Sequence, residues 1–204
     1  MTDPLPTGAT IGILGGGQLG RMLSVAAARL GFRTHIYEPG ANPPAADVAH
    51  ACTTAAYDDT AALTAFAQSV DVITYEFENI PTEALDILEA IKPIHPNREA
   101  LRISQDRLTE KDFLKGLGLN TAPYADIPDA AALDAALGTI GTPSILKTRR
   151  FGYDGKGQAR LKSDADAAQA IADMAGAPAL LEGFVDFTIE VSVIAARSAT
   201  GEVA

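Results

Sequence analysis

The stretch Ser144–Gln158 reads S-I-L-K-T-R-R-F-G-Y-D-G-K-G-Q and joins an apolar strand to a glycine-rich turn. Glycine has no Cβ, so the three glycines at its end let backbone N–H groups converge on an anion, and Lys147 and Lys156 add positive charge on either side. The spacing is not that of a Walker P-loop. Two interpretations follow: a loop that holds a polyphosphate, or a plain β-hairpin that turns at Asp154-Gly155.

Composition limits the class of protein. A chain of 204 residues that is 47% hydrophobic can fill the core of one large or two small domains. Its net charge of −10 argues against a nucleic-acid partner, because that binding needs clustered basic residues. One cysteine and scattered histidines suggest neither a disulfide nor a zinc site. With no basic, apolar leader and no run as long as a membrane span, we expect a soluble, cytoplasmic protein.

The first half predicts alternating strands and helices. An apolar run at 9–14 ends in a glycine turn, and apolar residues then recur at helical spacing as far as Leu30. Further strands are predicted at 33–37, 49–53, 70–77 and 93–95, and further helices at 60–68 and 82–90. This alternation indicates an α/β fold with a doubly wound, Rossmann-like parallel sheet.

The glycine turn reads Gly15-x-Gly17-x-x-Gly20, and Glu38 follows at the end of the next strand. This spacing fits a dinucleotide fingerprint, so a nicotinamide enzyme is one interpretation. A helix N-terminus also favours a phosphate of any kind. A third possibility is a turn that only lets strand and helix pack closely.

Two carboxylates end the fourth predicted strand. Glu76 and Glu78 point to the same side of the strand, at the carboxyl end where parallel sheets bind ligands. The alternative is a solvated edge at which Asn79 simply begins the loop. The stretch alone supports either interpretation.

The second half predicts an α+β unit. A charged helix at 98–117 leads into it as a surface helix between domains. Strands are predicted at 122–127, 145–148, 158–161, 179–184 and 188–197, and helices at 129–137 and 164–174. We expect one domain at 1–98 and a second at 99–204. The last strand turns at 198–201 with three residues left to pair back, so we expect an excised piece or a strand completed from elsewhere.

Five segments carry a family resemblance. They are I-G-I-L-G-G-G-Q-L-G-R-M (11–22), T-Y-E-F-E-N-I-P (74–81), S-Q-D-R (104–107), I-L-K-T-R-R-F-G-Y-D-G-K-G-Q (145–158) and L-L-E-G-F-V-D-F-T-I-E-V-S-V-I (180–194). In this order they resemble the N-terminal part of the 5-(carboxyamino)imidazole ribonucleotide synthase family, ATP-grasp enzymes of purine biosynthesis. The resemblance implies a pre-ATP-grasp domain followed by an incomplete ATP-grasp domain. It also implies that the glycine turn serves aminoimidazole ribonucleotide and not a dinucleotide.

The same resemblance implies roles for individual residues. The ribonucleotide would be contacted by Gln18, Leu19 and Glu76. The catalytic residues that face the reacting amine and the carboxyl donor would be Tyr153, Asp154 and Lys156. ATP would be bound by Arg107, Lys147, Gly152, Tyr153, Asp154, Gly155, Lys156, Gly157, Gln158, Glu182, Gly183, Phe184, Val185 and Glu190. Among these, 182–185 would face the adenine, and Glu190 the ribose hydroxyls. Phe151 departs from the glycine of some relatives.

The implied chemistry is the ATP-dependent carboxylation of aminoimidazole ribonucleotide by bicarbonate through carboxyphosphate. Mg²⁺ would be needed, with ligands expected beyond residue 204 and none within this chain, so we expect the chain alone to be inactive. Family members commonly pair, which makes a homodimer of the full-length enzyme an expectation. Three alternatives stay open: a related ATP-grasp carboxylase or formate-using transformylase, a non-catalytic nucleotide-binding module, and a nicotinamide oxidoreductase.

Overall fold

The computed structural model describes residues 4–152, 156–198 and 200–204. The chain forms two compact units: the first runs to Arg102 and includes Ala195–Ala204, and the second is Ile103–Ile194. The domain boundary expected between residues 98 and 99 stays a prediction. No helix in the described part of the chain is long and apolar enough to cross a membrane.

The first unit is built on a parallel sheet in the order β3-β2-β1-β4. The predicted α/β class with a doubly wound sheet is confirmed. The strands are β1 (Thr10–Leu14), β2 (Arg33–Tyr37), β3 (Ala51–Thr53) and β4 (Val72–Tyr75), and the helices are α1 (Gln18–Arg29), η1 (Pro44–Asp47), α2 (Thr60–Gln68), α3 (Thr82–Glu89) and α4 (Arg98–Ser104).

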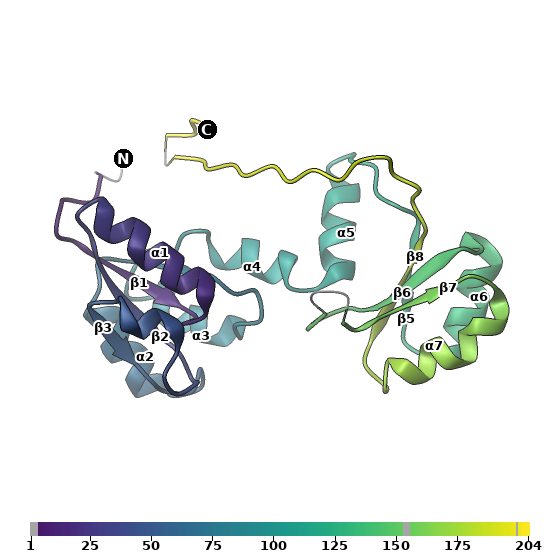
Figure 1. Cartoon of the computed structure of the whole chain (residues 1–204), viewed down its shortest axis with the longest axis horizontal. Coiled ribbons are helices and arrows are strands. Elements are labelled where there is room, and N and C mark those ends of the chain that lie inside the picture. The colour runs from purple at the N-terminus through teal and green to yellow at the C-terminus, as the bar shows by residue number, and fades with distance from the viewer. Residues whose placement is uncertain (1–3, 153–155, 199) are drawn as a thin grey trace. The chain divides into compact units, whose positions relative to one another are not determined.

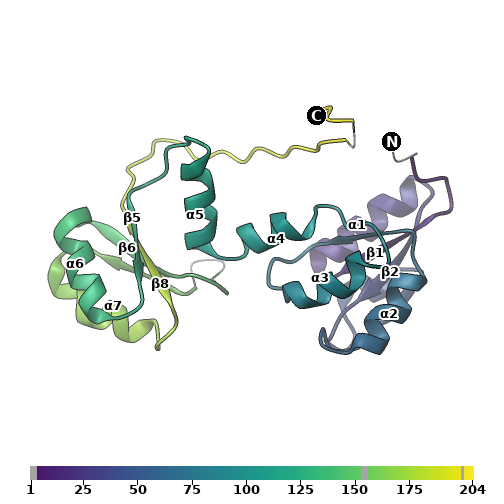
Figure 2. The same cartoon turned by 180° about the vertical axis from the view of Figure 1, so that it is seen from behind.

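Apolar side chains cover both faces of this sheet. Leu14, Tyr37 and Ile73 belong to the core that α2 and α3 complete. Ile13 and Ile36 point the other way, because side chains alternate along a strand, and they pack with residues of η1. Figures 1 and 2 show α1 on one face and α2 and α3 on the other.

Helix α1 buries a different face from the one that its apolar residues suggest. Its buried residues are Gly20, Ser24 and Ala27, whereas the side chain of Met22 is 65% exposed. A Cβ at Gly20 would lie 2.7 Å from the Gly15 carbonyl oxygen. Small residues therefore let the helix approach the strand closely, and the larger apolar residues are left at the surface.

The end of the sheet differs from the prediction in two places. Strand β4 ends at Tyr75, so Glu76 and Glu78 lie in the loop that follows it. The strand predicted at 93–95 is reduced to a single parallel bridge between Ile73 and Ile94.

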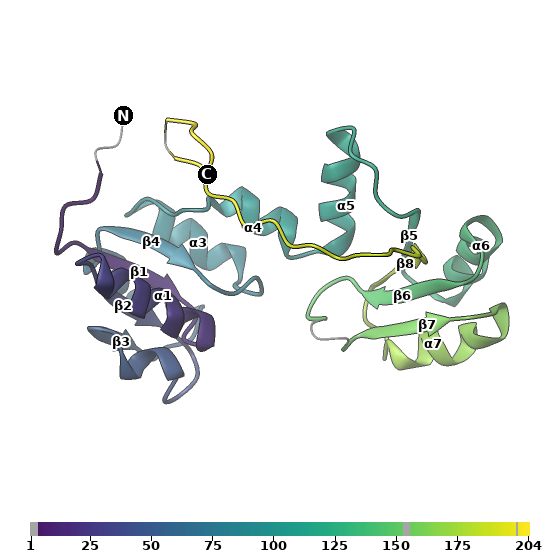
Figure 3. The ribbon, with the colours of Figure 1, turned by 45° about the horizontal axis from the view of Figure 1, so that its top comes forward.

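The second unit contains an antiparallel sheet in the order β5-β8-β6-β7. Its strands are β5 (Tyr124–Ile127), β6 (Ser144–Thr148), β7 (Gln158–Leu161) and β8 (Ala179–Gly183), and its helices are α5 (Arg107–Gly116), α6 (Ala130–Ile140), η2 (Asp164–Asp166) and α7 (Ala167–Asp173). Leu146 and Leu181 pack into a core with residues of α6 and α7. Figure 3 shows α7 alongside the β6–β7 hairpin. Lys147 and Glu182, each the neighbour of one of these leucines, belong to the opposite face.

The single helix predicted at 98–117 is wrong, because two helices meet there. Helix α4 ends at Ser104, and α5 begins at Arg107. Asp106 between them is extended (φ −128°, ψ 118°), and its side chain accepts hydrogen bonds from two N–H groups of the first turn of α5. A capping aspartate starts a new helix at this point.

The strand predicted at 188–197 is also wrong. In the described residues that segment is extended but unassigned, except for an antiparallel bridge between Arg197 and Val203. The backbones of Ala196 and Ala204 exchange two hydrogen bonds, so the predicted turn at 198–201 does bring the chain back on itself. A strand needs a neighbour along its length, and only the last residues of this segment have one.

Candidate functional site

In the first unit the glycine turn is held by two carboxylates. The Gly16 N–H donates to Glu38 Oε2 at 2.8 Å, and the Gly17 N–H donates to Glu76 Oε1 at 2.9 Å. These N–H groups, at the start of α1, are the donors that a dinucleotide phosphate would use. Carboxylate oxygens already take that position, which argues against the dinucleotide interpretation.

Glu76 lies flat against this turn. Gly15 has a φ of +98°, and a Cβ there would lie 2.8 Å from Glu76 Cγ, so glycine is required for both reasons. Burial raises the pKa of Glu76; the hydrogen bond from Gly17 opposes the rise, and the charges of Glu38 and Glu78 add to it. A carboxylate with a raised pKa at the end of a strand is suited to accept hydrogen bonds from an amine or a hydroxyl.

Tyr57 adds a polar group to the same surroundings. Its hydroxyl oxygen is buried and has no hydrogen-bond partner among the described residues. Burial is the main cause that raises its pKa, the charges of Glu38 and Glu76 add to the effect, and the backbone of Gly15 opposes it. Carboxylates and an unpaired hydroxyl therefore gather at the carboxyl end of the parallel sheet.

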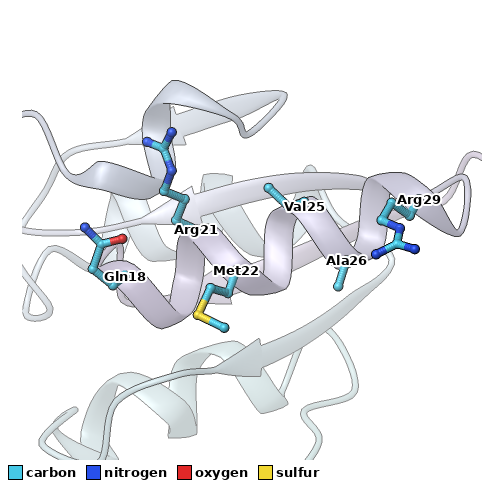
Figure 4. A pocket seen from close by; sticks show the side chains of 6 residues that line it. All are labelled: Gln18, Arg21, Met22, Val25, Ala26 and Arg29. Carbon is cyan, nitrogen blue, oxygen red and sulfur yellow. The ribbon is translucent and has the colours of Figure 1, made fainter.

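The first turn of α1 opens onto a surface hollow. Gln18 and Leu19 follow Gly17 directly and are exposed. The hollow, about 360 Å³, is lined along one side of α1 (Figure 4) by Gln18, Arg21, Met22, Val25, Ala26 and Arg29. Of the three residues expected to contact the ribonucleotide, only Gln18 lines this hollow; Leu19 is the next residue of the same turn, and Glu76 accepts from the preceding Gly17 N–H.

In the second unit two lysines share one carboxylate. Lys147 Nζ lies 2.7 Å from Glu182 Oε2, and Lys111 Nζ lies 3.1 Å from Glu182 Oε1. The side chains of Lys111, Lys147 and Glu182 are only 14%, 23% and 12% exposed. Three charged groups with a net charge of +1 are thus withdrawn from water together, which favours an additional anion.

The sheet register places this cluster. Glu182 on β8 stands opposite Tyr124 on one side and Ile145 on the other. Lys147 is two residues along β6 from Ile145 and so projects from the same face. Burial acts to raise the pKa of Glu182, but hydrogen bonds and charge from Lys147 and Lys111 outweigh it and lower the pKa. Glu182 is therefore ionised at neutral pH.

Arg107 holds the base of the glycine-rich loop. Its Nη2 donates to the Gly152 carbonyl at 2.8 Å, and its Nε donates to the Thr148 carbonyl at 3.2 Å. Across the loop, Gly157 has a φ of +66°, and a Cβ there would lie 2.5 Å from Thr148 Oγ1. Phe151 also lies in the left-handed region, with φ +62°, a conformation that glycine adopts without strain.

A second ion pair fixes the start of α5 to the end of β6. Asp106 Oδ2 lies 2.8 Å from Arg149 Nη2, and both Asp106 oxygens accept from Arg149 Nε at 3.1 Å. Burial opposes ionisation of Asp106, but Arg149 and the N–H groups of Thr109 and Leu108 outweigh it and lower the pKa of Asp106. This pair sets the position of α5, and with it those of Arg107 and Lys111.

The segment after Glu182 forms a short backbone edge. The Gly183 N–H donates to the Pro123 carbonyl at 2.9 Å, and the Phe184 N–H donates to the Pro143 carbonyl at 3.1 Å. The Arg160 guanidinium lies 4.3 Å from the centre of the Phe184 ring. Val185 follows as the next residue with an N–H along this edge.

The chain matches two domain families in succession. Residues 8–105 match the ribonucleotide synthetase preATP-grasp domain, and residues 112–204 match the ATP-grasp domain. An N5-carboxyaminoimidazole ribonucleotide synthase of Brucella melitensis is 56% identical over 98% of this chain and 56% of its own length.

Over almost its whole length the chain is thus similar to the first part of N5-carboxyaminoimidazole ribonucleotide synthases. A crystal structure of an N5-carboxyaminoimidazole ribonucleotide synthetase in complex with ADP is 42% identical, with a TM-score of 0.95 over 100% of this chain and 54% of its own. The Aspergillus clavatus synthase in complex with ADP and 5-aminoimidazole ribonucleotide is 27% identical, with a TM-score of 0.80 over 89% of this chain and 48% of its own. The chain spans about half the length of these members of the synthase family.

Most site residues expected from the synthase family lie either at the glycine turn of the first unit or around the glycine-rich loop and β8 of the second. Arg107, Lys147, Gly152, Gly157 and Glu182 lie around the base of the glycine-rich loop and β8. Lys156 and Gln158 are exposed just before and at the first residue of β7. Gly183 is the last residue of β8, and Phe184 and Val185 follow it. Glu190 is exposed in the extended segment. Tyr153, Asp154 and Gly155 lie outside the described residues, so their roles stay predictions.

Lys111 is the residue that the sequence interpretation missed. Its charge is one of those that predict a surface helix between domains, but its ammonium group contacts Glu182 and lies 5.5 Å from the centre of the Tyr124 ring. One signal was available, because Lys111 follows Arg107 by four residues and so projects from the same face of the helix.

Magnesium does not fit the described residues. In the parts of the chain that the structure describes, no group of three or more histidine, cysteine, aspartate or glutamate side chains could hold a metal ion. Both oxygens of Glu182 are engaged by lysines, which compete with a cation.

Proposed function

We propose that the chain carries the ribonucleotide-binding and ATP-binding parts of an enzyme that carboxylates 5-aminoimidazole ribonucleotide. The reaction class is supported by the synthase family and by relatives whose structures contain ADP, ATP or 5-aminoimidazole ribonucleotide. The observation that carries the proposal is the half-buried Lys147–Glu182–Lys111 cluster beside the glycine-rich loop, because it offers cations where a polyphosphate can reach them.

In this proposal the γ-phosphoryl group of ATP passes to an oxygen of bicarbonate, which gives ADP and carboxyphosphate. The exocyclic amine of the ribonucleotide then attacks the carboxyphosphate carbon, phosphate leaves with the electrons of the C–O bond, and the amine loses a proton. Carboxyphosphate reacts with water, so the loop at 152–158 has to cover the site. Tyr153, Asp154 and Lys156 are proposed to face the reacting groups from that loop.

The ATP-binding part lies in the second unit. Lys147 and Arg107 are proposed to contact phosphate oxygens, since both place cations beside the loop base. The backbone edge at 182–185 is proposed to face the adenine, with the Val185 N–H as donor, because the N–H groups before it are bonded to carbonyls. Glu190 is proposed to accept hydrogen bonds from the ribose hydroxyls.

The ribonucleotide-binding part lies in the first unit. Glu76 is proposed to accept hydrogen bonds from the amine or hydroxyls of the ribonucleotide, and Gln18 and Leu19 to contact it from the first turn of α1. The two carboxylates at the glycine turn support this assignment of Glu76, because carboxylate oxygens attract the amine and hydroxyl donors of the ribonucleotide.

Further parts of the proposal concern the whole enzyme. Bicarbonate and Mg²⁺ as reaction partners, a homodimer, a cytoplasmic location and a domain boundary between residues 98 and 99 are proposed from the family. Matches at 8–105 and 112–204 support a division near that boundary.

The test is calorimetric titration of the chain with ATP, with 5-aminoimidazole ribonucleotide and with NADH. We expect Glu76→Ala to weaken ribonucleotide binding at least about tenfold, and Lys147→Ala to weaken ATP binding by a similar factor. Each variant serves as the control for the other ligand. NADH binding that competes with the ribonucleotide, or ribonucleotide binding unaffected by Glu76→Ala, would contradict the proposal.

A further inference from the structure

Helix α5 delivers a third cation to the proposed nucleotide site. Lys111 lies one helical turn after Arg107, and its ammonium group is 3.1 Å from Glu182 Oε1 with its side chain 14% exposed. It also lies over the ring of Tyr124, the residue directly opposite Glu182 in the sheet. Three elements, α5, β5 and β8, therefore meet at this ammonium group.

The two lysines that contact Glu182 carry the same charge but lie on different structural elements. Its two oxygens are taken by different lysines: Oε2 by Lys147 at 2.7 Å and Oε1 by Lys111 at 3.1 Å. Lys147 lies on the strand that leads into the glycine-rich loop, whereas Lys111 lies on the helix that Asp106 and Arg149 fix in place. Lys147 is thus the lysine on the strand that enters the loop, and Lys111 is the one on the anchored helix.

The departure of Lys147 from Glu182 is opposed by electrostatics. A half-buried carboxylate that loses its cation is costly, because water does not replace the lost interaction fully. If Lys147 moves to a phosphate while Lys111 stays, Glu182 keeps one ammonium partner. Without Lys111, movement of Lys147 to a phosphate would leave Glu182 with neither of its two lysine partners.

We propose that Lys111 is a positioning residue that keeps Glu182 neutralised, so that Lys147 is free to bind a nucleotide phosphate. This inference rests on the proposed ATP-binding function of the second unit. It makes a specific demand on the ligand: Lys111 matters for nucleotides that carry a diphosphate, and it does not matter for the nucleoside alone.

The experiment titrates the folded chain with ADP and with adenosine, and compares wild type with Lys111→Met, Lys111→Arg and Lys115→Met. Lys115 is the matched control, because it lies one turn further along α5 and its ammonium group is 5.9 Å from the same Tyr124 ring. We expect Lys111→Met to weaken ADP binding about tenfold or more and adenosine binding less than about twofold. Lys111→Arg restores ADP binding, and Lys115→Met leaves it unchanged.

A double-mutant cycle with Glu182→Gln separates this role from simple attachment of α5 to the sheet. The neutral amide that Glu182→Gln introduces needs no ammonium partner, so adding Lys111→Met to Glu182→Gln is expected to cost no further ADP affinity. Circular dichroism checks that each variant is folded, and Lys111→Gln replaces Lys111→Met if the latter unfolds.

The possible failures can be told apart. Equal ADP binding by wild type and Lys111→Met, or equal losses for ADP and adenosine, would overturn the inference and leave the proposed function in place. A wild-type chain that binds no ADP would overturn the proposed nucleotide site and the inference with it.

Discussion

Asp106 is expected to contribute to stability through two separable interactions. It caps α5 by accepting from the N–H groups of Leu108 and Thr109, and it pairs with Arg149. A cap of this kind is worth about 1 kcal/mol. Hydrogen bonds to a charged group are worth about 1.5–3 kcal/mol, which we reduce to about 1–2 kcal/mol because Arg149 is 25% and Asp106 18% exposed.

Two substitutions separate these contributions. Asparagine caps a helix as well as aspartate does, so Asp106→Asn should lose only the ion pair, about 1–2 kcal/mol of the free energy of unfolding, and Asp106→Ala about 2–3 kcal/mol. Asp129 is the matched control, since it caps α6 through the Ala132 N–H. We expect Asp129→Asn to be near neutral and Asp129→Ala to lose about 1 kcal/mol.

The assay is urea unfolding followed by circular dichroism at several pH values. The pKa of Asp106 is lowered in the folded chain, so the unfolded chain takes up the proton first as the pH falls. The stabilisation by Asp106 is therefore complete above the ordinary aspartate pKa and is lost as the pH falls through the lower, folded value. Equal losses for Asp106→Asn and Asp129→Asn at pH 7 would refute this account. So would a stability difference between wild type and Asp106→Asn that does not shrink as the pH falls below the ordinary aspartate pKa.

Three further substitutions test individual backbone and side-chain features by the same unfolding measurement. Gly20→Ala places a Cβ 2.7 Å from the Gly15 carbonyl oxygen and should lose about 2 kcal/mol; wild-type stability would mean that α1 can move away. Phe151 has a φ of +62°, and Phe151→Gly relieves the strain of that angle. The free energy of unfolding should rise by roughly 0.5 kcal/mol after the entropy of glycine is counted; a decrease would show that contacts of the Phe151 ring contribute more than the strain costs. Tyr57→Phe removes a buried hydroxyl without a described partner and should match wild type or gain up to about 1 kcal/mol; a clear loss would reveal a partner for the hydroxyl.

Elements set by local patterns were predictable from the sequence. The strands Arg33–Tyr37 and Gln158–Leu161 and the helix Thr60–Gln68 have the bounds that their apolar spacing and flanking residues predict. The order of strands and helices then gives the parallel sheet, because short connections of alternating type leave little choice of topology. Local chemistry was sufficient for the fold class.

Elements that depend on distant contacts were not predictable. Helix-forming residues flank Asp106 on both sides, and the break between α4 and α5 coincides with its pairing to Arg149 far along the chain. The side of α1 that is buried also depends on a tertiary contact, because Gly20 packs so closely against the Gly15 carbonyl that this side of the helix faces the sheet. Neither effect leaves a periodic pattern in the sequence.

The candidate site shows the same division. The glycine turn and the lysine strand were visible, because glycine and lysine have recognisable chemistry at short spacing. Lys111 was not, because a lysine on a charged helix has many surface explanations until Glu182 is found beside it. Only the register of β5 and β8 brings the partners of Lys111 together.

The extended segment at 185–194 has a practical consequence for work with the protein. Val185, Phe187, Ile189, Val191 and Val193 alternate with other residues, are exposed, and have no strand beside them among the described residues. An open, alternating apolar strand is a template for pairing with a second copy. The charges of Asp186 and Glu190 oppose that pairing. Solubility should therefore fall as the protein concentration rises, and storage as a dilute sample should keep the chain monodisperse.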